Sequence, residues 1–303
     1  MRSMNGVINI YKEKGYTSHD AVAIVRKQLG RVKAGHTGTL DPDAEGVLPI
    51  CIGRATKLAG FLTSAEKSYR AELILGRTTD TYDQGGRILS TETVDLNLFA
   101  AANLAIRDAV NFFVGGYMQM PPMYSALKLK GKKLYELARA GKTVERSPRH
   151  IEITRIDIIG SDPLRNRLWL DIDCGKGTYI RSLCADIGQK LGCGACMGEL
   201  IRTKSGSFTL DSAIKLSDLE KAVLISPEQA FPAAHAVLTV YSKAAFNGNP
   251  IPLENVAIEK WLEEGDHCWL YYDKAVIGLY ALRADMLRPE VMMHENHKCA
   301  RVR

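Results

Sequence analysis

The stretch from Lys33 to Lys57 limits the possible fold most, because glycine or proline recurs throughout it. Glycine weakens a helix and proline breaks one, so no regular helix can pass through these residues. We therefore predict a long polar loop that is interrupted by one short apolar strand, Val47–Ile52. A loop of this length inside a compact domain is more often functional than idle. The interrupting residues are Gly35, Gly38, Pro42, Gly46, Pro49 and Gly53.

Around this loop the sequence alternates between strand and helix patterns. The spacing of apolar residues predicts helices near 18–29, 99–113 and 178–191, with Ser18 as the N-terminal cap of the first. Apolar runs and alternations predict strands at 7–10, 69–75, 151–159, 168–174 and 203–210. Further strands at 268–272 and 275–282 flank the turn Asp273-Lys274, which indicates a small β-rich module near the end of the chain.

The length and composition suit a folded chain of two domains. With 303 residues and a hydrophobic content of 46%, the chain can bury one large core and one small core. A polar, proline-bearing stretch at 226–236 suggests the boundary, which gives domains at 1–236 and 237–303. No apolar run reaches the roughly 20 residues of a bilayer span, and the N-terminal residues show no signal-peptide pattern. We therefore expect a cytoplasmic protein without membrane contact.

The seven cysteines indicate reduced thiols, because their number is odd and their spacing irregular. Cys193 and Cys196 have the spacing of half a zinc site. No second Cys-x-x-Cys and no His-x₃-His accompanies them in the sequence. We therefore expect no metal.

The long loop carries the first candidate for chemistry, Gly35-His36-Thr37-Gly38-Thr39-Leu40-Asp41-Pro42. It lacks the pattern of a phosphate-binding loop, since neither G-x-x-x-x-G-K-[ST] nor a helix-opening G-x-G-x-x-G occurs in the chain. Asp41 can serve as a nucleophile, as a general base or only as the acceptor of an Asx turn, and its spacing alone favours the turn. His36, taken by itself, indicates local hydrogen bonding.

A second candidate segment, Gly175-Lys176-Gly177-Thr178-Tyr179-Ile180-Arg181-Ser182-Leu183, lies where a predicted strand meets a predicted helix. Free backbone N–H groups at such a junction favour an anionic ligand. Arg181 falls in the first helical turn, which is an unfavourable place for a cation unless an anion pairs with it. Taken alone, this position fits an anionic partner and a solvated arginine equally well.

Together with three further motifs, these two segments resemble the TruB family of tRNA pseudouridine synthases. The order and spacing match over nearly all of residues 1–236. The resemblance implies an α+β fold with a mixed, largely antiparallel central sheet that is flanked by helices and holds an active-site cleft. Residues 237–303 resemble a PUA-type RNA-binding module more loosely, through Gly265-Asp266-His267-Cys268-Trp269 and Leu287-Arg288-Pro289. The three further motifs are Gly46-Val47-Leu48-Pro49 with Gly53-Arg54-Ala55-Thr56-Lys57, Lys67-Ser68-Tyr69-Arg70, and Asp80-Thr81-Tyr82-Asp83.

The resemblance implies isomerisation of the uridine at position 55 in the T loop of tRNA, with a carbon–carbon link replacing the N-glycosidic bond of a flipped-out nucleotide. Asp41 corresponds to the nucleophile of the family, and Arg181 corresponds to the arginine that keeps this aspartate ionised. Tyr69 corresponds to the catalytic tyrosine that stacks on the target base and can assist the final proton removal. The residues that contact the flipped nucleotide or line the uracil pocket correspond to His36, Tyr179 and Leu200. Because the reaction is redox-neutral, the resemblance implies no cofactor.

The net charge of +6 is concentrated in residues 117–150, which we call the basic insertion. This segment has eight basic side chains and two acidic ones, so the rest of the chain sums to zero. In the family this region closes over the T loop, where its charge would bind phosphates without regard to sequence. A solvated charged helix is the alternative. The expected phosphate ligands are Lys57, Lys128, Lys130, Lys132, Lys133, Arg139, Arg146 and Arg149.

Two other functions are considered beside a stand-alone, monomeric enzyme that acts on tRNA. A non-catalytic RNA-binding protein has no need of the Asp41, Tyr69 and Arg181 combination. A synthase that depends on a guide RNA tends to carry N-terminal extensions, which this compact sequence lacks, so we expect no guide RNA. One departure from the family pattern is Ile201, where an arginine is usual; we expect weaker phosphate attraction or altered packing there.

Overall fold

A computed structural model describes residues 4–100, 104–129, 131–142 and 144–294. Its main element is a ten-stranded mixed sheet in the order β14-β1-β3-β12-β4-β11-β10-β7, with β2 paired to β3 and β13 paired to β12. Within the described part of this sheet, only the β1–β14 and β12–β3 pairings are parallel, which confirms the predicted mixed, largely antiparallel sheet. The strands are β1 (Gly6–Lys12), β2 (Ala34–His36), β3 (Glu45–Ile52), β4 (Lys67–Leu75), β7 (Gly115–Gln119), β10 (Arg149–Asp162), β11 (Arg167–Cys174), β12 (Ala195–Ser205), β13 (Phe208–Thr209) and β14 (Ile214–Lys215).

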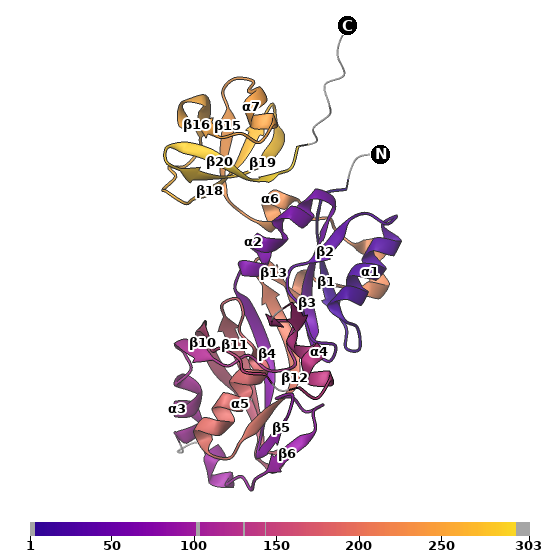
Figure 1. The fold of residues 1–303 in the computed structure, drawn as a ribbon, viewed down its shortest axis with the longest axis vertical. Coiled ribbons are helices and arrows are strands. Elements are labelled where there is room, and N and C mark those ends of the chain that lie inside the picture. Colours follow the sequence, from indigo (N-terminus) through magenta and orange to yellow (C-terminus); the bar gives the residue numbers. More distant parts are fainter. Residues whose placement is uncertain (1–3, 101–103, 130, 143, 295–303) are drawn as a thin grey trace.

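Short helices flank this sheet (Figure 1). Among the described residues, no helix is long and apolar enough to cross a membrane. These helices are α1 (Ser18–Gln28), α2 (Ala59–Ser64), α3 (Ala105–Asn111), α4 (Leu134–Arg139), α5 (Ile180–Leu191) and α6 (Pro227–Ala230). The last helix, α7 (Lys243–Phe246), lies in the second lobe described below. The helix expected at 99–113 is therefore shorter, and part of that range, 101–103, lies outside the described residues.

The cap of α1 differs from the prediction by one residue. Thr17 caps the helix, because its hydroxyl accepts a hydrogen bond from the Asp20 N–H while the Asp20 carboxylate accepts one from the Thr17 N–H. The Ser18 hydroxyl instead accepts from the Leu40 N–H at 2.9 Å and donates to the Leu40 carbonyl at 3.1 Å. Ser18 thus holds the long loop, and it is unavailable as a cap.

The core beneath α5 explains why this helix lies on the sheet. Leu183 and Ile187 are fully buried on its inner face, and they belong to the same apolar cluster as Leu73 and Leu170 of the sheet. Burying each such side chain stabilises the fold by about 1.5–3 kcal/mol. This packing fixes the position of α5 against β12 and β4, so it also fixes the residues at the start of the helix.

A second, six-stranded sheet forms a separate lobe at one end of the molecule (Figure 1), as the predicted β-rich module requires. We call residues 234–294 the C-terminal module. The chain enters it at Ala234, so the boundary expected between 236 and 237 falls inside its first strand. In sheet order, the strands are β16 (Ile251–Pro252), β20 (Met286–Met292), β19 (Ala275–Arg283), β18 (His267–Tyr272), β15 (Ala234–Leu238) and β17 (Val256–Ile258).

The C-terminal module shares an apolar core with the main sheet. Trp269 and Leu279 from the module are fully buried in one cluster with Val7 and Val47 from β1 and β3. The Trp269 indole N–H also donates to the Phe231 carbonyl at 2.9 Å. The module therefore packs against β3, the strand that follows Asp41.

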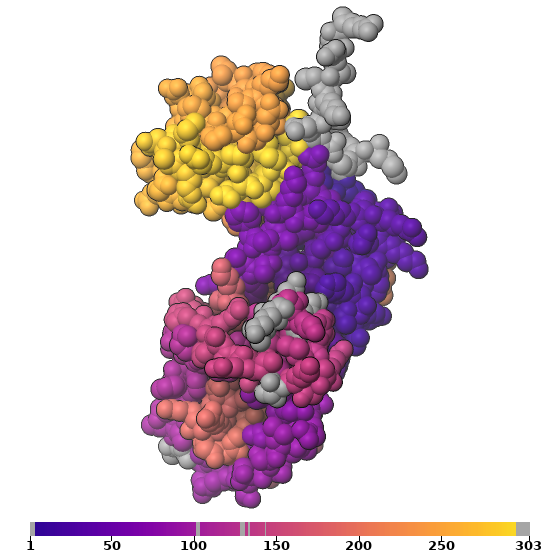
Figure 2. All heavy atoms as spheres, viewed as in Figure 1, coloured from indigo at the N-terminus to yellow at the C-terminus, as the bar shows by residue number. Residues whose placement is uncertain are grey.

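Two small hairpins complete the fold. One consists of β5 (Arg77–Thr79) and β6 (Ile88–Thr91), and the other of β8 (Lys128–Leu129) and β9 (Lys132–Lys133). The second hairpin and α4 form part of the basic insertion. Figure 2 shows this segment, in magenta, across the middle of the face in view.

Candidate active site

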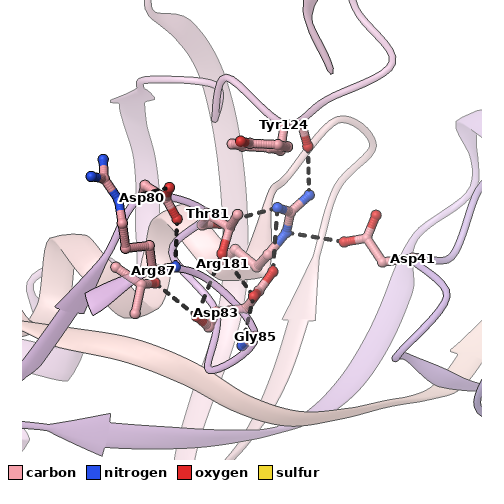
Figure 3. Close-up of polar contacts among 9 residues, drawn as sticks. Asp41, Asp80, Thr81, Asp83, Gly85, Arg87, Tyr124 and Arg181 are labelled. Atoms are coloured by element: carbon pink, nitrogen blue, oxygen red, sulfur yellow. Dashed lines mark hydrogen bonds and ion pairs between the residues drawn. The ribbon is translucent and has the colours of Figure 1, made fainter. Parts of the chain in front are cut away.

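The buried guanidinium of Arg181 is the centre of the candidate site (Figure 3). Arg181 is 6% exposed, and its Nε lies 3.0 Å from Asp41 Oδ2. Its Nη1 lies 3.5 Å from Asp83 Oδ2 and donates to the Thr81 carbonyl at 3.0 Å, while its Nη2 donates to the Tyr124 carbonyl at 2.8 Å. One side chain from the first turn of α5 therefore binds the long loop, the turn after β5 and the basic insertion.

The backbone on both sides of Asp41 is held in place. Leu40 is bound through its N–H and its carbonyl to the Ser18 hydroxyl, as described above. On the other side, the fully buried Lys12 donates from Nζ to the Pro42 carbonyl at 3.1 Å. These contacts fix the carboxylate of Asp41 in front of Arg181.

Burial dominates the electrostatics of Asp41. The surroundings raise the pKa of Asp41 because they disfavour the charged form, and Arg181 offsets this effect only in part. The negative charge of Asp83 raises the same pKa further. Arg181 thus acts in the direction that the resemblance implies, because it favours the ionised form of Asp41. The side chain of Asp41 is nevertheless 46% exposed, so a substrate can reach it. A raised pKa makes the ionised carboxylate a stronger base.

Asp83 was not singled out from the sequence, although it belongs to one of the five motifs. The Thr81 hydroxyl donates to Asp83 Oδ1 at 2.8 Å, and the Gly85 N–H donates to the same oxygen at 3.1 Å. Oδ2 is left facing Arg181 (Figure 3). The turn-rich composition of this segment was the available signal, but the turn could not be placed beside α5 from sequence.

A second buried arginine, Arg202 of β12, was also missed as a site residue. It is 1% exposed and donates to the Val47 carbonyl at 2.7 Å and to the Gly38 carbonyl at 3.2 Å. Its backbone explains one glycine of the loop, because a Cβ on Gly46, whose φ is +108°, would lie 2.2 Å from the Arg202 carbonyl oxygen. Arg202 therefore shapes both ends of the long loop and does not present its charge to solvent.

Ile201 stands where the family usually has a second arginine. It lies on β12 opposite Glu45 of β3 and Arg70 of β4, and it is half-buried. Its aliphatic side chain therefore occupies a packed position in the sheet.

Tyr69 and Leu200 lie beside each other on β4 and β12. In the register of these strands Tyr69 is opposite Arg202 and Leu200 is opposite Ala71. Tyr69 is 9% exposed and Leu200 is 8% exposed, and both belong to the main apolar core. Burial raises the pKa of Tyr69, and the charge of Arg202 lowers it by a smaller amount. The phenol of Tyr69 is therefore neutral at physiological pH.

His36 ends β2 and lies half-buried at the start of the loop. Its Nδ1 accepts from the Gly38 N–H at 3.3 Å, and its ring contacts the ring of His19 edge to face at 5.2 Å between centroids. Burial lowers the pKa of His36 to about 4, with a smaller contribution from His19. The imidazole is thus neutral at physiological pH.

Tyr179 immediately precedes α5 and is half-buried. Burial raises the pKa of its phenol, so it too is neutral at physiological pH. Its backbone N–H and carbonyl are bound by Gln119, a residue that the sequence did not single out. Tyr179 and Arg181 leave the same helical turn, so their side chains are positioned together.

The basic insertion presents only some of its expected phosphate ligands to solvent. Arg146 is half-buried, and its Nη1 donates to the Pro121 carbonyl at 2.8 Å, so it braces the base of the insertion. Where side chains are described, the exposed cations among the expected ligands within the insertion are Lys132, Arg139 and Arg149. Lys130 and the side chains of Lys128 and Lys133 lie outside the described residues.

Lys57 has a structural partner. It is exposed at the end of the 3₁₀ helix Gly53–Leu58, and its Nζ donates to the Met292 carbonyl at 3.0 Å. Through this hydrogen bond the 3₁₀ helix contacts the C-terminal module. A phosphate would have to compete with this carbonyl for the ammonium group.

The cysteines of the described residues are free and buried. Burial raises the pKa of Cys196 to about 11, so this thiol is protonated at physiological pH. Within the part of the chain that the structure describes, no three metal-ligating side chains gather at one place. Cys193 and Cys196 are therefore accounted for as buried thiols.

Comparison with known proteins assigns nearly the whole chain to one group. Residues 26–180 match the family model of the TruB family pseudouridylate synthase N-terminal domain, and residues 181–238 match that of the tRNA pseudouridylate synthase B C-terminal domain. The chain is 47% identical over 290 residues to tRNA pseudouridine synthase B of Alkaliphilus oremlandii, covering 92% of this chain and 94% of that protein. It is 45% identical over 273 residues to the protein of the same name from Lachnoclostridium phytofermentans, covering 85% and 87%.

The fold is also similar to solved structures. One chain in the structure of an H/ACA RNP bound to a substrate RNA containing 2'-deoxyuridine superimposes with a TM-score of 0.69. The match covers 96% of this chain and 86% of that chain at 23% sequence identity. At this identity the likeness establishes the fold alone.

Proposed function

This chain belongs to the TruB family of pseudouridylate synthases, which are isomerases, and from this premise we propose that it converts the uridine at position 55 in the T loop of tRNA to pseudouridine. The observation that carries the proposal is the contact of 3.0 Å between Asp41 and the buried Arg181. Desolvation of the buried guanidinium offsets much of the attraction in this pair, so the pair is better explained by a functional role than by stability.

In this proposal Asp41 is the nucleophile. The reaction breaks the N-glycosidic bond, turns the uracil and joins its carbon 5 to the ribose. Carbon 5 loses its proton and the released ring nitrogen gains one, so the reaction is a net isomerisation. Asp41 must be ionised whether it adds to the sugar, adds to the base or assists elimination, and these three routes stay open. Arg181 supplies the positive charge that favours the ionised form, while Asp83 shares that charge.

Tyr69 is assigned to stacking on the target base. Its neutral phenol suits an aromatic platform better than a general base, because burial raises its pKa. His36, neutral for the reason given above, contacts the flipped nucleotide, and Tyr179 with Leu200 lines the uracil pocket. Flipping the nucleotide costs a few kcal/mol, which stacking and phosphate contacts offset.

In this proposal the cations of the basic insertion bind the phosphates of the RNA backbone. Its exposed cations lie on the segment that also binds Arg181 through the Tyr124 carbonyl, so phosphate binding occurs next to the catalytic pair. The C-terminal module, which is PUA-like, is proposed as a second RNA contact. Residues 234–294 carry five basic and eight acidic side chains, so this contact must depend on shape and individual groups more than on net charge.

The deciding experiment mixes the purified protein with unmodified tRNA and maps pseudouridine. We expect modification at position 55, and no modification of a tRNA that carries cytidine there. Absence of product at stoichiometric protein would contradict the enzyme proposal in favour of a non-catalytic RNA-binding protein. Activity on an isolated T-arm hairpin without any other RNA is expected, and a requirement for a guide RNA would contradict the stand-alone function. Light scattering of the pure protein should give a monomer.

A further inference from the structure

The side-chain amide of Gln119 closes around the backbone of Tyr179. Gln119 is the last residue of β7 and is 1% exposed. Its Oε1 accepts from the Tyr179 N–H at 2.8 Å, and its Nε2 donates to the Tyr179 carbonyl at 3.1 Å. One amide thus satisfies both backbone groups of a single residue. Backbone groups at this depth need such partners, because an unpaired buried group is costly.

Tyr117 and Asp186 fix the orientation of that amide. Gln119 Nε2 also donates to Tyr117 Oη at 2.7 Å, and the Tyr117 hydroxyl donates to Asp186 Oδ2 at 3.1 Å. A flipped amide would place Nε2 against the Tyr179 N–H and Oε1 against its carbonyl, so only one orientation satisfies every donor and acceptor. The network joins β7 to α5 at two points, Tyr179 before the helix and Asp186 within it.

The two hydrogen bonds from Gln119 to the Tyr179 backbone, which we call the clamp, lie where α5 begins. The Tyr179 carbonyl also accepts from the Leu183 N–H at 3.0 Å, which is the first hydrogen bond of α5. Arg181 lies in the same turn, and its guanidinium faces Asp41. The Ser182 hydroxyl donates to the Met120 carbonyl at 2.9 Å, so the residue after Gln119 is tied to this turn as well. The base of the basic insertion and the first turn of α5 therefore form one hydrogen-bonded unit.

We propose that Gln119 is a positioning residue for the isomerisation. By holding the backbone of Tyr179, it sets where the Tyr179 side chain and the Arg181 guanidinium meet the target uridine. This inference rests on the proposed function. The Gln119 amide is bound to Tyr179 and Tyr117, so we expect it to act on the site through α5. Misplacing a reacting group by about 1 Å can cost about a hundredfold in rate.

Gln119→Leu tests the role with a side chain of similar size that cannot hydrogen-bond. We expect a single-turnover rate on tRNA about a hundredfold below that of the wild type, with a tRNA dissociation constant that changes by less than about twofold. Tyr117→Phe is the matched control, because it removes a hydroxyl from the same network but leaves the amide on Tyr179; its rate should fall only a few-fold. A Gln119→Leu rate within about threefold of wild type would overturn the inference.

Gln119→Glu gives a readout that a purely structural role does not predict. When protonated, the carboxyl group that this substitution introduces could donate to the Tyr179 carbonyl and accept from its N–H, whereas the ionised form would repel the carbonyl. The single-turnover rate of Gln119→Glu relative to wild type should therefore rise as the pH is lowered. The same ratio for Gln119→Leu should stay constant. A ratio for Gln119→Glu that is independent of pH contradicts the inference.

Two further measurements keep the outcomes apart. Wild-type protein that forms no pseudouridine overturns the proposed function, whereas an active wild type with unaffected Gln119 variants overturns only this inference. If a variant fails to fold, amide hydrogen exchange on the wild type decides instead. The Tyr179 N–H should be protected like the amides within α5, and exchange as fast as that of an exposed loop would refute the clamp.

Discussion

The long loop around Asp41 and the basic insertion both reach Arg181, but they are built in opposite ways. The loop is anchored on each side of Asp41 by the buried Ser18 and Lys12, and Leu40 within it is only 3% exposed. The insertion is anchored near its base, where the Met120, Pro121 and Tyr124 carbonyls accept side-chain hydrogen bonds. Beyond that base it offers exposed cations. One region fixes a single carboxylate, and the other presents charge, so mutations should separate the chemical rate from RNA affinity.

The largest effect is expected from Asp41→Asn. The amide keeps the shape of the side chain but loses the charge and the nucleophile, so the single-turnover rate should fall by about 10⁴-fold or more. Affinity for tRNA, which depends on the insertion, should change by less than about twofold. Rapid-quench measurements and filter binding on the same protein check both values. Turnover near the wild-type rate would remove Asp41 from the mechanism.

Arg181→Met should give the next largest loss. It removes the positive charge from Asp41 and leaves Asp83 and two carbonyls without their donor, so we expect the single-turnover rate to drop about a thousandfold. Arg181→Lys is the matched control, because it keeps the charge while losing the fork geometry, and it should retain more activity. Unchanged activity of Arg181→Met would contradict the proposed pair. Because Arg181 also binds the Tyr124 carbonyl, a simultaneous loss of affinity would show that the two regions are not separable.

The pH dependence sharpens the same contrast. Ionised Asp41 is required and its pKa is raised, so activity should be lost as the pH falls through that raised value, above the ordinary aspartate pKa of about 3.9. Arg181 lowers this pKa, so Arg181→Met should move the acidic limb of the rate profile to higher pH. Affinity for tRNA over the same pH range should not follow this limb. If the acidic limb of the rate profile lies at the same pH in Arg181→Met as in wild type, ionisation of Asp41 does not control that limb.

A triple replacement of Lys132, Arg139 and Arg149 by Gln tests the insertion. We expect tRNA affinity to fall by roughly tenfold or more at low salt, and the slope of log affinity against log salt to decrease by about 0.7–0.9 for each phosphate that no longer binds a cation. The rate at saturating protein should stay within about threefold of wild type. The control replaces Lys27, Lys215 and Lys221, which are also exposed, and makes the same charge change elsewhere. Equal effects of the two triples would mean that net charge matters and that its location does not.

The smallest effect is expected from Lys57→Gln. Its ammonium group already donates to the Met292 carbonyl, so tRNA affinity should change by less than about twofold. Loss of one exposed hydrogen bond should lower the free energy of unfolding by about 0.5–1 kcal/mol, measured by denaturant titration. A strong affinity loss without a stability change would return Lys57 to the group of phosphate ligands.

Most of the architecture could be predicted from local patterns. The strand pattern at 168–174 became β11, and the helical pattern at 178–191 became α5, because each buries one continuous apolar face. The cap of α1 was misplaced, since Thr17 and Ser18 are both good caps. Only the tertiary contact of Ser18 with Leu40 decides between them.

The site was less accessible to sequence reasoning, because it depends on contacts between distant segments. Arg202 follows Ile201 in a segment where cations were expected to attract phosphate, but it lies buried against two loop carbonyls. Gln119 carried no signal, since a glutamine at the end of a strand is usually solvated. The raised pKa of Asp41 was also beyond prediction, because the balance between burial and Arg181 depends on how many atoms surround the carboxylate.

The strand order has a consequence for how long the molecule takes to become active during synthesis. β2 pairs with Ile50–Ile52 of β3, whereas Glu45 and Gly46, the part of β3 nearest Asp41, pair with Ile201 and Arg202 of β12, so this part of the strand lacks that partner until Arg202 has been made. Arg181 is synthesised 140 residues after Asp41, a delay of roughly 7 to 28 s at about 5–20 residues per second. Throughout that interval the carboxylate has no arginine beside it. If the proposed function holds, the nascent chain therefore contains the cations assigned to phosphate binding before the Asp41–Arg181 pair can form.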